Sequence, residues 1–181
     1  MVVGPEYGPL AGICVAVSEG RHGLAGRSLR ALVVGFPVAI ALAALLTFAL
    51  IGSGIAQKTL SPTEHELTLF ISQPNWYSVI VAILAGLAGM LALVSAKAGP
   101  LIGVLISVTT IPAAANVGVG VAYGLWGDSM RAAGHLGINV FAILASGLVV
   151  LWVARRARRA RFRAYATAGG SQRDGRGTSF V

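Results

Sequence analysis

The chain has 181 residues, of which 56% are hydrophobic and 11% are charged, and its formal net charge at pH 7 is +8. Soluble domains carry about 25% charged residues, so this composition excludes an ordinary soluble domain. The apolar residues gather in blocks of about twenty, the length at which an α-helix crosses about 30 Å of hydrocarbon. We therefore predict an all-α fold, a polytopic transmembrane helix bundle.

The apolar blocks predict about five spans in a transmembrane domain over residues 1–153. These spans are Met1–Val17, Leu29–Gly52, Trp76–Ala96, Leu101–Trp126 and Leu136–Val153. Aromatic side chains near the predicted span ends, where interfacial anchors belong, are Trp76, Tyr77, Trp126 and Trp152. We expect a basic juxtamembrane segment over 154–166 and a disordered tail over 167–181.

The first predicted span contains a proline followed by a carboxylate, Pro5 and Glu6. No basic segment precedes its apolar residues, so it does not read as a cleaved signal peptide. A carboxylate at bilayer depth is costly and typically serves ion coordination or proton coupling, which makes Glu6 a candidate binding residue. A second interpretation stays open, in which Glu6 lies in water near the chain terminus. Cys14, the single cysteine, excludes an internal disulfide and is predicted to be a buried thiol.

Small residues at four-residue spacing predict close contacts between helices. The pairs are Ala82 with Gly86, Ala85 with Gly89, and Gly120 with Gly124. Membrane helices rich in alanine and glycine also contain such pairs by chance. The pairs therefore indicate a tight bundle and nothing more specific.

The fourth predicted span, LIGVLISVTTIPAAANVGVGVAYGLW, carries Pro112 at its middle. Proline lacks an N–H and clashes with the carbonyl four residues back, so we predict that the helix is broken there. Thr109, Thr110 and Asn116 lie beside the break with Ser107, and they could replace the hydration of a small solute. A structural alternative stays open: the hydroxyls bond carbonyls of their own helix, and Asn116 caps a half-helix or links two helices.

The distribution of basic residues predicts the orientation of the chain. Arginines concentrate after the last span in ARRARRARFRA, and basic clusters beside a span are retained in the cytoplasm and attract anionic lipid. With that tail inside, Arg21, Arg27, Arg30 and Lys97 also fall inside, whereas Lys58 and Arg131 fall outside. This pattern predicts a multi-pass protein of the inner membrane with a cytoplasmic C-terminus. No stacking platform accompanies the arginines, so we predict no nucleic-acid partner.

Two parts of the chain have the same order of elements, which suggests an inverted repeat. The helix containing Pro5 and the helix containing Pro112 are each followed by a short polar turn and another span. Aligning the two parts pairs Pro5 with Pro112 and Gly20 with Gly127. A competing register aligns GPLAG with GPLIG. In the predicted topology the two proline-containing helices run in opposite directions, as in many secondary transporters whose broken helices form the substrate site.

Four segments, MVVGPEYGPLAG, RSLRALVVGFPVAI, SAKAGPLIGVLISVTTIPAAANVGVGVA and HLGINV, resemble the bacterial DUF389 membrane proteins. The resemblance covers most of residues 1–153, and SVTTIPAAANVGV and MVVGPEYGPL are its specific parts. It implies a polytopic membrane fold and brings no established activity and no catalytic residues. Members of this family typically carry further hydrophobic sequence before the first of these segments. We therefore expect either a misassigned start codon or a shortened copy, and in both cases an incomplete first half of the predicted site.

The remaining polar residues give no metal site and no enzyme motif. His135 and Asn139 lie one turn apart on the same helix face, and we expect His135 at the external interface. His22 and His65 fall in loops on opposite sides of the membrane, so no metal-ligand set can be assembled and no cofactor is predicted. The chain contains no P-loop, no G-x-S-x-G and no H-E-x-x-H, so we expect no enzyme activity.

The leading functional hypothesis is a transporter-like or channel-like protein for a small solute or ion. Its site would lie at the two broken helices, lined by Glu6, Thr109, Thr110 and Asn116. The alternative is a non-transporting membrane scaffold or sensor that acts through its basic cytoplasmic tail. The expected partners are membrane lipids, a small solute or ion, and a second copy of the chain in a homo-oligomer.

Overall fold

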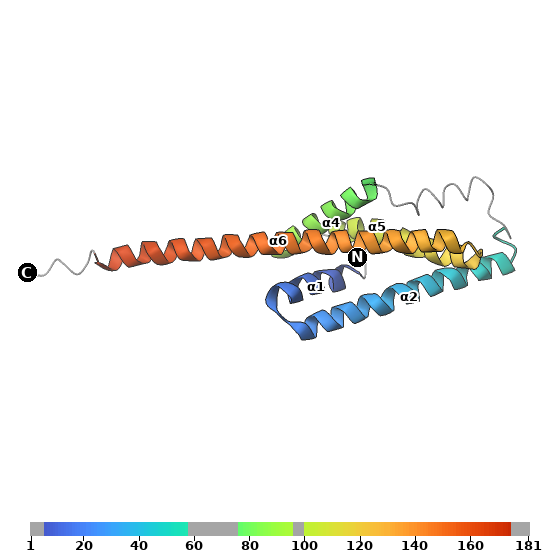
Figure 1. Ribbon diagram of the computed structural model, residues 1–181, viewed down its shortest axis with the longest axis horizontal. Coiled ribbons are helices and arrows are strands. Elements are labelled where there is room, and N and C mark those ends of the chain that lie inside the picture. Colours follow the sequence, from blue (N-terminus) through green and yellow to red (C-terminus); the bar gives the residue numbers. More distant parts are fainter. Residues whose placement is uncertain (1–5, 58–75, 96–99, 175–181) are drawn as a thin grey trace, which may run out of the picture.

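The computed structural model describes residues 6–57, 76–95 and 100–174, with the backbone alone for 100–105 and 161–174. This part of the chain consists of helices and their connections, with no strand (Figure 1). The helices are α1 Tyr7–Glu19, α2 His22–Gly52, α4 Trp76–Val94, α5 Pro100–Ala122 and α6 Trp126–Asp174. The prediction of an all-α helix bundle is confirmed.

Three helices are long and apolar enough to cross a membrane: α2, α4 and the part Trp126–Ala160 of α6. Helix α5 has 23 residues, and its part Ile106–Ala122 is also apolar. Helix α1 differs from the predicted span 1–17, because it begins at Tyr7 and has 13 residues. At 1.5 Å per residue it is about 20 Å long, roughly two-thirds of the hydrocarbon thickness. The described residues thus form four long helices and one short one, and Pro5 lies outside them.

Two helices extend beyond the predicted span boundaries. Helix α2 begins at His22 rather than at Leu29, so most of the basic connection forms its first turns. Helix α6 continues to Asp174, so the basic segment 154–166 and the first residues of the predicted disordered tail are helical. Alanine and arginine have high helix propensity, which favours this continuation. The rest of the predicted tail, 175–181, lies outside the described residues.

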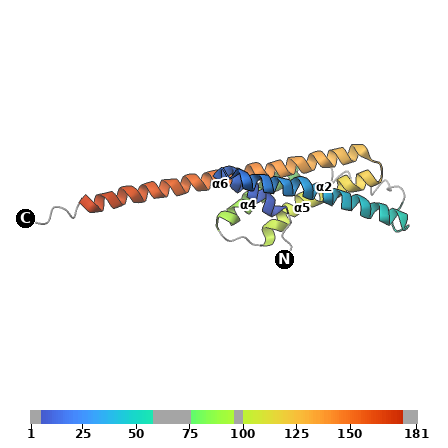
Figure 2. The ribbon, with the colours of Figure 1, turned by 90° about the horizontal axis from the view of Figure 1, so that it is seen from below.

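Contacts between helices fix their directions relative to α6. In α4, Ser78 contacts His135 and Gly86 lies against Ile143, so α4 and α6 are parallel. In α5, the Val117 carbonyl accepts a bond from Ser129 and the Thr109 carbonyl accepts one from Asn139, so α5 is antiparallel to α6. Helix α1 runs parallel to α6 and turns back into α2. Figures 1 and 2 show α6 lying along the whole bundle and continuing well beyond it.

Close packing of α4 on α6 depends on small residues in α4. Ala82 and Ala85 are fully buried, and a Cβ added at Gly86 would lie 2.6 Å from the Ile143 carbonyl oxygen. A row of buried residues along α6, which contacts α4 and α5, recurs at alternating spacings of three and four, as in a coiled-coil seam. They are Ser129, Ala132, Leu136, Asn139, Ile143, Ser146 and Val150, all buried. The prediction that the small-residue pairs of α4 mark a tight helix contact is confirmed.

Two glycines with positive φ form the turns of the two helix hairpins. Gly20 ends α1 with φ 68°, and Gly124 follows α5 with φ 73°, conformations that glycine adopts without steric cost. In each turn the next residue donates its N–H to a carbonyl five residues back, Arg21 to Ala16 and Leu125 to Gly120. Gly124 is therefore a turn residue rather than part of a helix contact.

These turns also correct the register of the suggested repeat. Helices α1 and α5 run in opposite directions, as expected for an inverted arrangement, but the matching turns pair Gly20 with Gly124 and not with Gly127. In this register Glu6 precedes Gly20 by the same number of residues as Thr110 precedes Gly124. Pro5 and Pro112 are then no longer equivalent positions.

Side-chain contacts define the two ends of the bundle. At one end, Arg155 of α6 donates to the Ser18 carbonyl and lies 3.5 Å from the Glu19 carboxylate. At the other end, the Tyr123 hydroxyl donates to the Gln57 carbonyl at 3.1 Å. The α1–α2 turn and the start of the arginine-rich part of α6 therefore lie at the same end.

Candidate functional site

A buried carboxylate and a hydroxyl meet between α1 and α5. The Glu6 side chain directly precedes α1 and is only 6% exposed, and Thr110 of α5 is fully buried. The Thr110 hydroxyl donates to Glu6 Oε1 at 3.0 Å. The partial positive charge of the α1 N-terminus favours a carboxylate at this place. Glu6 is thus buried, contrary to the interpretation in which it lies in water.

The Thr110 hydroxyl has two acceptors for its single proton. Besides Glu6 Oε1, it lies 3.2 Å from the Ile106 carbonyl oxygen. When Glu6 is charged, its carboxylate accepts a hydrogen bond from the Thr110 hydroxyl. A protonated Glu6 can instead donate to Thr110, which then donates to Ile106. The pair can therefore hold Glu6 in either protonation state without a change of backbone.

A second polar cluster joins α4, α5 and α6 on the other side of α5. Asn139 is fully buried, and its Nδ2 donates to the Thr109 carbonyl at 3.0 Å and to Ser78 Oγ at 3.3 Å. Ser78 Oγ donates to Asn139 Oδ1 at 3.4 Å and lies 2.7 Å from His135 Nε2. His135 is 5% exposed, so its predicted interfacial position is wrong: α6 starts at Trp126, which places His135 well inside the bundle.

The position of Asn139 indicates how deep both clusters lie. In the sequence, Asn139 is midway between Trp126 and Trp152, two exposed aromatic residues of the kind that anchor helices at membrane interfaces. Thr109 contacts Asn139, and Thr110 follows Thr109 directly. The Glu6–Thr110 pair therefore lies near the middle of the bundle rather than at an end.

Helix α5 is not broken at Pro112, which corrects the sequence prediction. It runs as one α-helix from Pro100 to Ala122 with Pro112 inside it. Thr109 and Thr110 donate to the Ile106 carbonyl, and Asn139 donates to the Thr109 carbonyl. Membrane helices tolerate an internal proline where polar groups of the same and neighbouring helices lie close to it, as these groups do.

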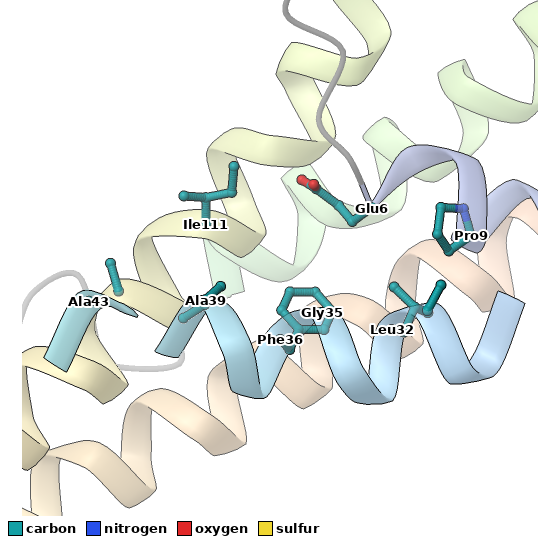
Figure 3. Close-up of a pocket in the computed structure, with 11 residues that line it drawn as sticks. Glu6, Pro9, Leu32, Gly35, Phe36, Ala39, Ala43 and Ile111 are labelled. Atoms are coloured by element: carbon teal, nitrogen blue, oxygen red, sulfur yellow. The ribbon is translucent and has the colours of Figure 1, made fainter. Parts of the chain in front are cut away.

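The described part of the structure contains a cavity of about 350 Å³ between α1, α2 and α5 (Figure 3). Glu6 borders it from α1. The wall on α2 includes Ala31, Gly35, Ala39 and Ala43, small residues whose four-residue spacing leaves this face of the helix hollow. The other lining residues are Pro9, Leu32, Phe36, Ile111, Ala114 and Ala115. Among the described residues of the lining, Glu6 is therefore the only one with a polar side chain.

The structure brings together only part of the predicted site. Glu6 and Thr110 are in contact, and Glu6 borders the cavity. The Thr109 hydroxyl donates to the Ile106 carbonyl at 2.8 Å, which is the structural alternative considered for it. Asn116 is half-buried and does not border the cavity; it lies about 9 Å from Thr110 along the axis of α5. Its contact with a solute stays a prediction.

Several residues of these clusters were not singled out from the sequence. Ser78 directly follows two interfacial aromatic residues and so resembles part of a span end. The small residues of α2 have the same four-residue spacing as those of α4, and this spacing was the available signal. Ser107, which was singled out, has a buried hydroxyl that bonds no other described residue.

The fold and the buried polar site define a helical membrane protein. The family described as "Domain of unknown function (DUF389)" matches residues 1–145, and the chain belongs to this family. An uncharacterised protein of Methanocaldococcus jannaschii is similar, with 27% identity over 158 residues that cover 83% of this chain and 44% of that protein. The chain thus spans less than half the length of this relative. No solved structure matches the chain.

Proposed function

We propose that this protein is a transporter-like or channel-like membrane protein that moves a small solute or ion past Glu6. One observation carries the proposal: the Glu6 carboxylate is buried near mid-depth, held by Thr110, and borders a cavity between three helices. Burying an ionisable group at this depth costs several kcal/mol, and such groups typically mark ion and proton pathways. The inverted directions of α1 and α5 add to this reading, since transporter sites are commonly built at such helix pairs.

Three of the four predicted residues have a role in this proposal. Glu6 accepts a proton or another cation, and Thr110 keeps the carboxylate in place in both protonation states. Asn116 lines the path farther along α5, where the solute leaves the Glu6 site. Glu6 is the only ionisable side chain among the described residues of the cavity lining, and we propose no enzyme activity and no cofactor.

Flux through reconstituted vesicles tests the proposal. Purified full-length protein is placed in liposomes, and proton entry is followed with trapped pyranine and uptake with labelled sodium and methylammonium. We expect protein-dependent flux of at least one of these probes, and a fall of about tenfold or more in Glu6→Gln and in Asn116→Leu. Glu19→Gln, an exposed carboxylate at the other end of α1, serves as the matched control and should retain flux.

Two results would contradict the proposal of transport past Glu6. One is the absence of protein-dependent flux for all three probes, and the other is equal flux in wild type and Glu6→Gln. A chain without residues 161–181 is included because α6 continues beyond the bundle as a basic helix, the feature that favours the scaffold or sensor alternative (Figure 1). Transport through the Glu6 site predicts that this truncated chain retains its flux.

We also propose that the protein lies in the cell membrane with its C-terminus in the cytoplasm. The α1–α2 turn and Arg155 lie at the same end, so the basic residues of both segments gather on one side, which the positive-inside rule assigns to the cytoplasm. The partners proposed on this side are anionic lipids, for which the arginines of α6 supply the charge.

Cysteine labelling of cells tests this orientation with little background, because the native Cys14 is 2% exposed. Gly23 and Gly127 lie at opposite ends of the bundle, and an added side chain meets nothing within 4 Å at either position. A membrane-impermeant maleimide should label Gly127→Cys in intact cells and Gly23→Cys only after the membrane is opened. The reverse pattern would contradict the proposed orientation.

A further inference from the structure

We propose that the cavity beside Glu6 binds an organic cation with an apolar body, such as a protonated arylalkylamine. This inference rests on the proposed function, because it names the substrate class of the same site. It follows from the size, charge and chemistry of the cavity wall.

The charge of the wall excludes anions. Glu6 is buried and borders the cavity, and the lining residues that the structure describes include no lysine, arginine or histidine. An anion would meet a carboxylate without a compensating donor side chain. A cation, by contrast, gains a direct partner in a surrounding of low polarity, where charge pairs interact strongly.

The chemistry of the wall disfavours an inorganic cation. Such an ion needs several oxygen ligands to replace its hydration shell. Apart from Glu6, the lining consists of alanine, glycine, proline, leucine, isoleucine and phenylalanine side chains. An organic ammonium group carries its own apolar substituent and has at most three N–H donors. One carboxylate can therefore accept much of its hydrogen bonding.

The size and shape of the wall suit the apolar part of such a molecule. The volume of about 350 Å³ lies at the lower end of the range for small-molecule sites. Figure 3 shows Glu6, at the start of α1, and Phe36 of α2 bordering the same space, with Leu32 one turn from Phe36. An aromatic ring within about 6 Å of a cation adds a favourable electrostatic contact. An arylalkylamine can therefore place its nitrogen at Glu6 and its hydrocarbon against α2.

Three probes of equal shape and different charge test the inference: 4-phenylbutylammonium, 4-phenylbutanol and 4-phenylbutyrate. Binding to the purified full-length chain in detergent is measured by titration calorimetry, with empty micelles as the blank. We expect the ammonium to bind most tightly, and Glu6→Gln to weaken its binding about tenfold or more. The alcohol should bind weakly and equally to both proteins, and Glu19→Gln should bind the ammonium as wild type does.

A second pair of variants makes the test independent of Glu6. Phe36 borders the cavity, whereas Phe48 lies on the exposed surface of the same helix. Phe36→Ala should weaken ammonium binding several-fold, and Phe48→Ala should leave it unchanged. Thermal unfolding of each variant in the same detergent shows whether it is folded.

The outcomes separate this inference from the proposed function. Equal binding of the three probes, or ammonium binding that changes in neither Glu6→Gln nor Phe36→Ala, would overturn the inference. Glu6-dependent ion flux without ammonium binding would also overturn it, and would leave transport standing. Glu6-dependent ammonium binding without flux of any probe would support the inference about the ligand and would contradict the proposal of transport.

Discussion

Replacing Gly86 with leucine should destabilise the bundle by about 3 kcal/mol or more, at the upper end of what overpacking costs. A Cβ at this position would lie 2.6 Å from the Ile143 carbonyl oxygen and 2.9 Å from the Ile143 Cα. These obstacles are backbone atoms of α6 and cannot rotate away, so the two helices must separate. Their separation removes the close van der Waals packing that holds membrane helices together.

Thermal unfolding in detergent, followed by circular dichroism, measures this effect as a fall in Tm. Gly137→Leu is the matched control, because Gly137 lies on the exposed face of α6 and an added Cβ would meet nothing within 4 Å. It should unfold near the wild-type temperature. Equal stability of the Gly86 and Gly137 variants would mean that the α4–α6 contact is not as close as described.

Replacing Asn139 with leucine should destabilise the bundle by about 1–3 kcal/mol. The two side chains have similar size, so the main loss is in hydrogen bonds. The Thr109 carbonyl loses its bond from Nδ2, and Ser78 loses both of its bonds with the amide. Bonds between membrane helices contribute about 0.6 kcal/mol each on average and at most about 1.7, so the sum stays within this range.

A double-mutant cycle separates these bonds from other effects of the change. Ser78→Ala, Asn139→Leu and the double variant are unfolded under the same conditions. If the amide and the hydroxyl are coupled, the double variant should lose less stability than the two single losses added together. Strict additivity would contradict the proposed cluster.

The sequence predicted the class of the protein well because membrane spans follow from composition and length. Runs such as WYSVIVAILAGLAGMLALV are apolar over the length of a bilayer, and they form α4 within two residues of the predicted boundaries. It also singled out Glu6 and Thr110, since a carboxylate and hydroxyls are rare in apolar segments. Their contact could not be predicted from spacing, because they are far apart in the chain.

The errors concern places where neighbouring helices change a local tendency. Pro112 predicts a break when α5 is considered alone, but α5 packs against α6, whose Asn139 bonds the Thr109 carbonyl three residues before the proline, and the helix continues. His135 was expected at the interface because the span was predicted to start at Leu136. The turn at Gly124 begins α6 earlier and places His135 inside the bundle.

By itself, then, the sequence determined that this is an all-α membrane protein of the DUF389 type, which end of its bundle carries most of the arginines, and which polar residues are candidates for a site. Only the tertiary structure decided that Glu6 meets Thr110, that Asn139 joins three helices, and that the small residues of α2 border a cavity while those of α4 fill a helix contact. The physical reason is that lipid is as apolar as a packed helix surface. Apolar residues facing lipid and apolar residues facing protein therefore look alike in the sequence, and only the packing distinguishes them.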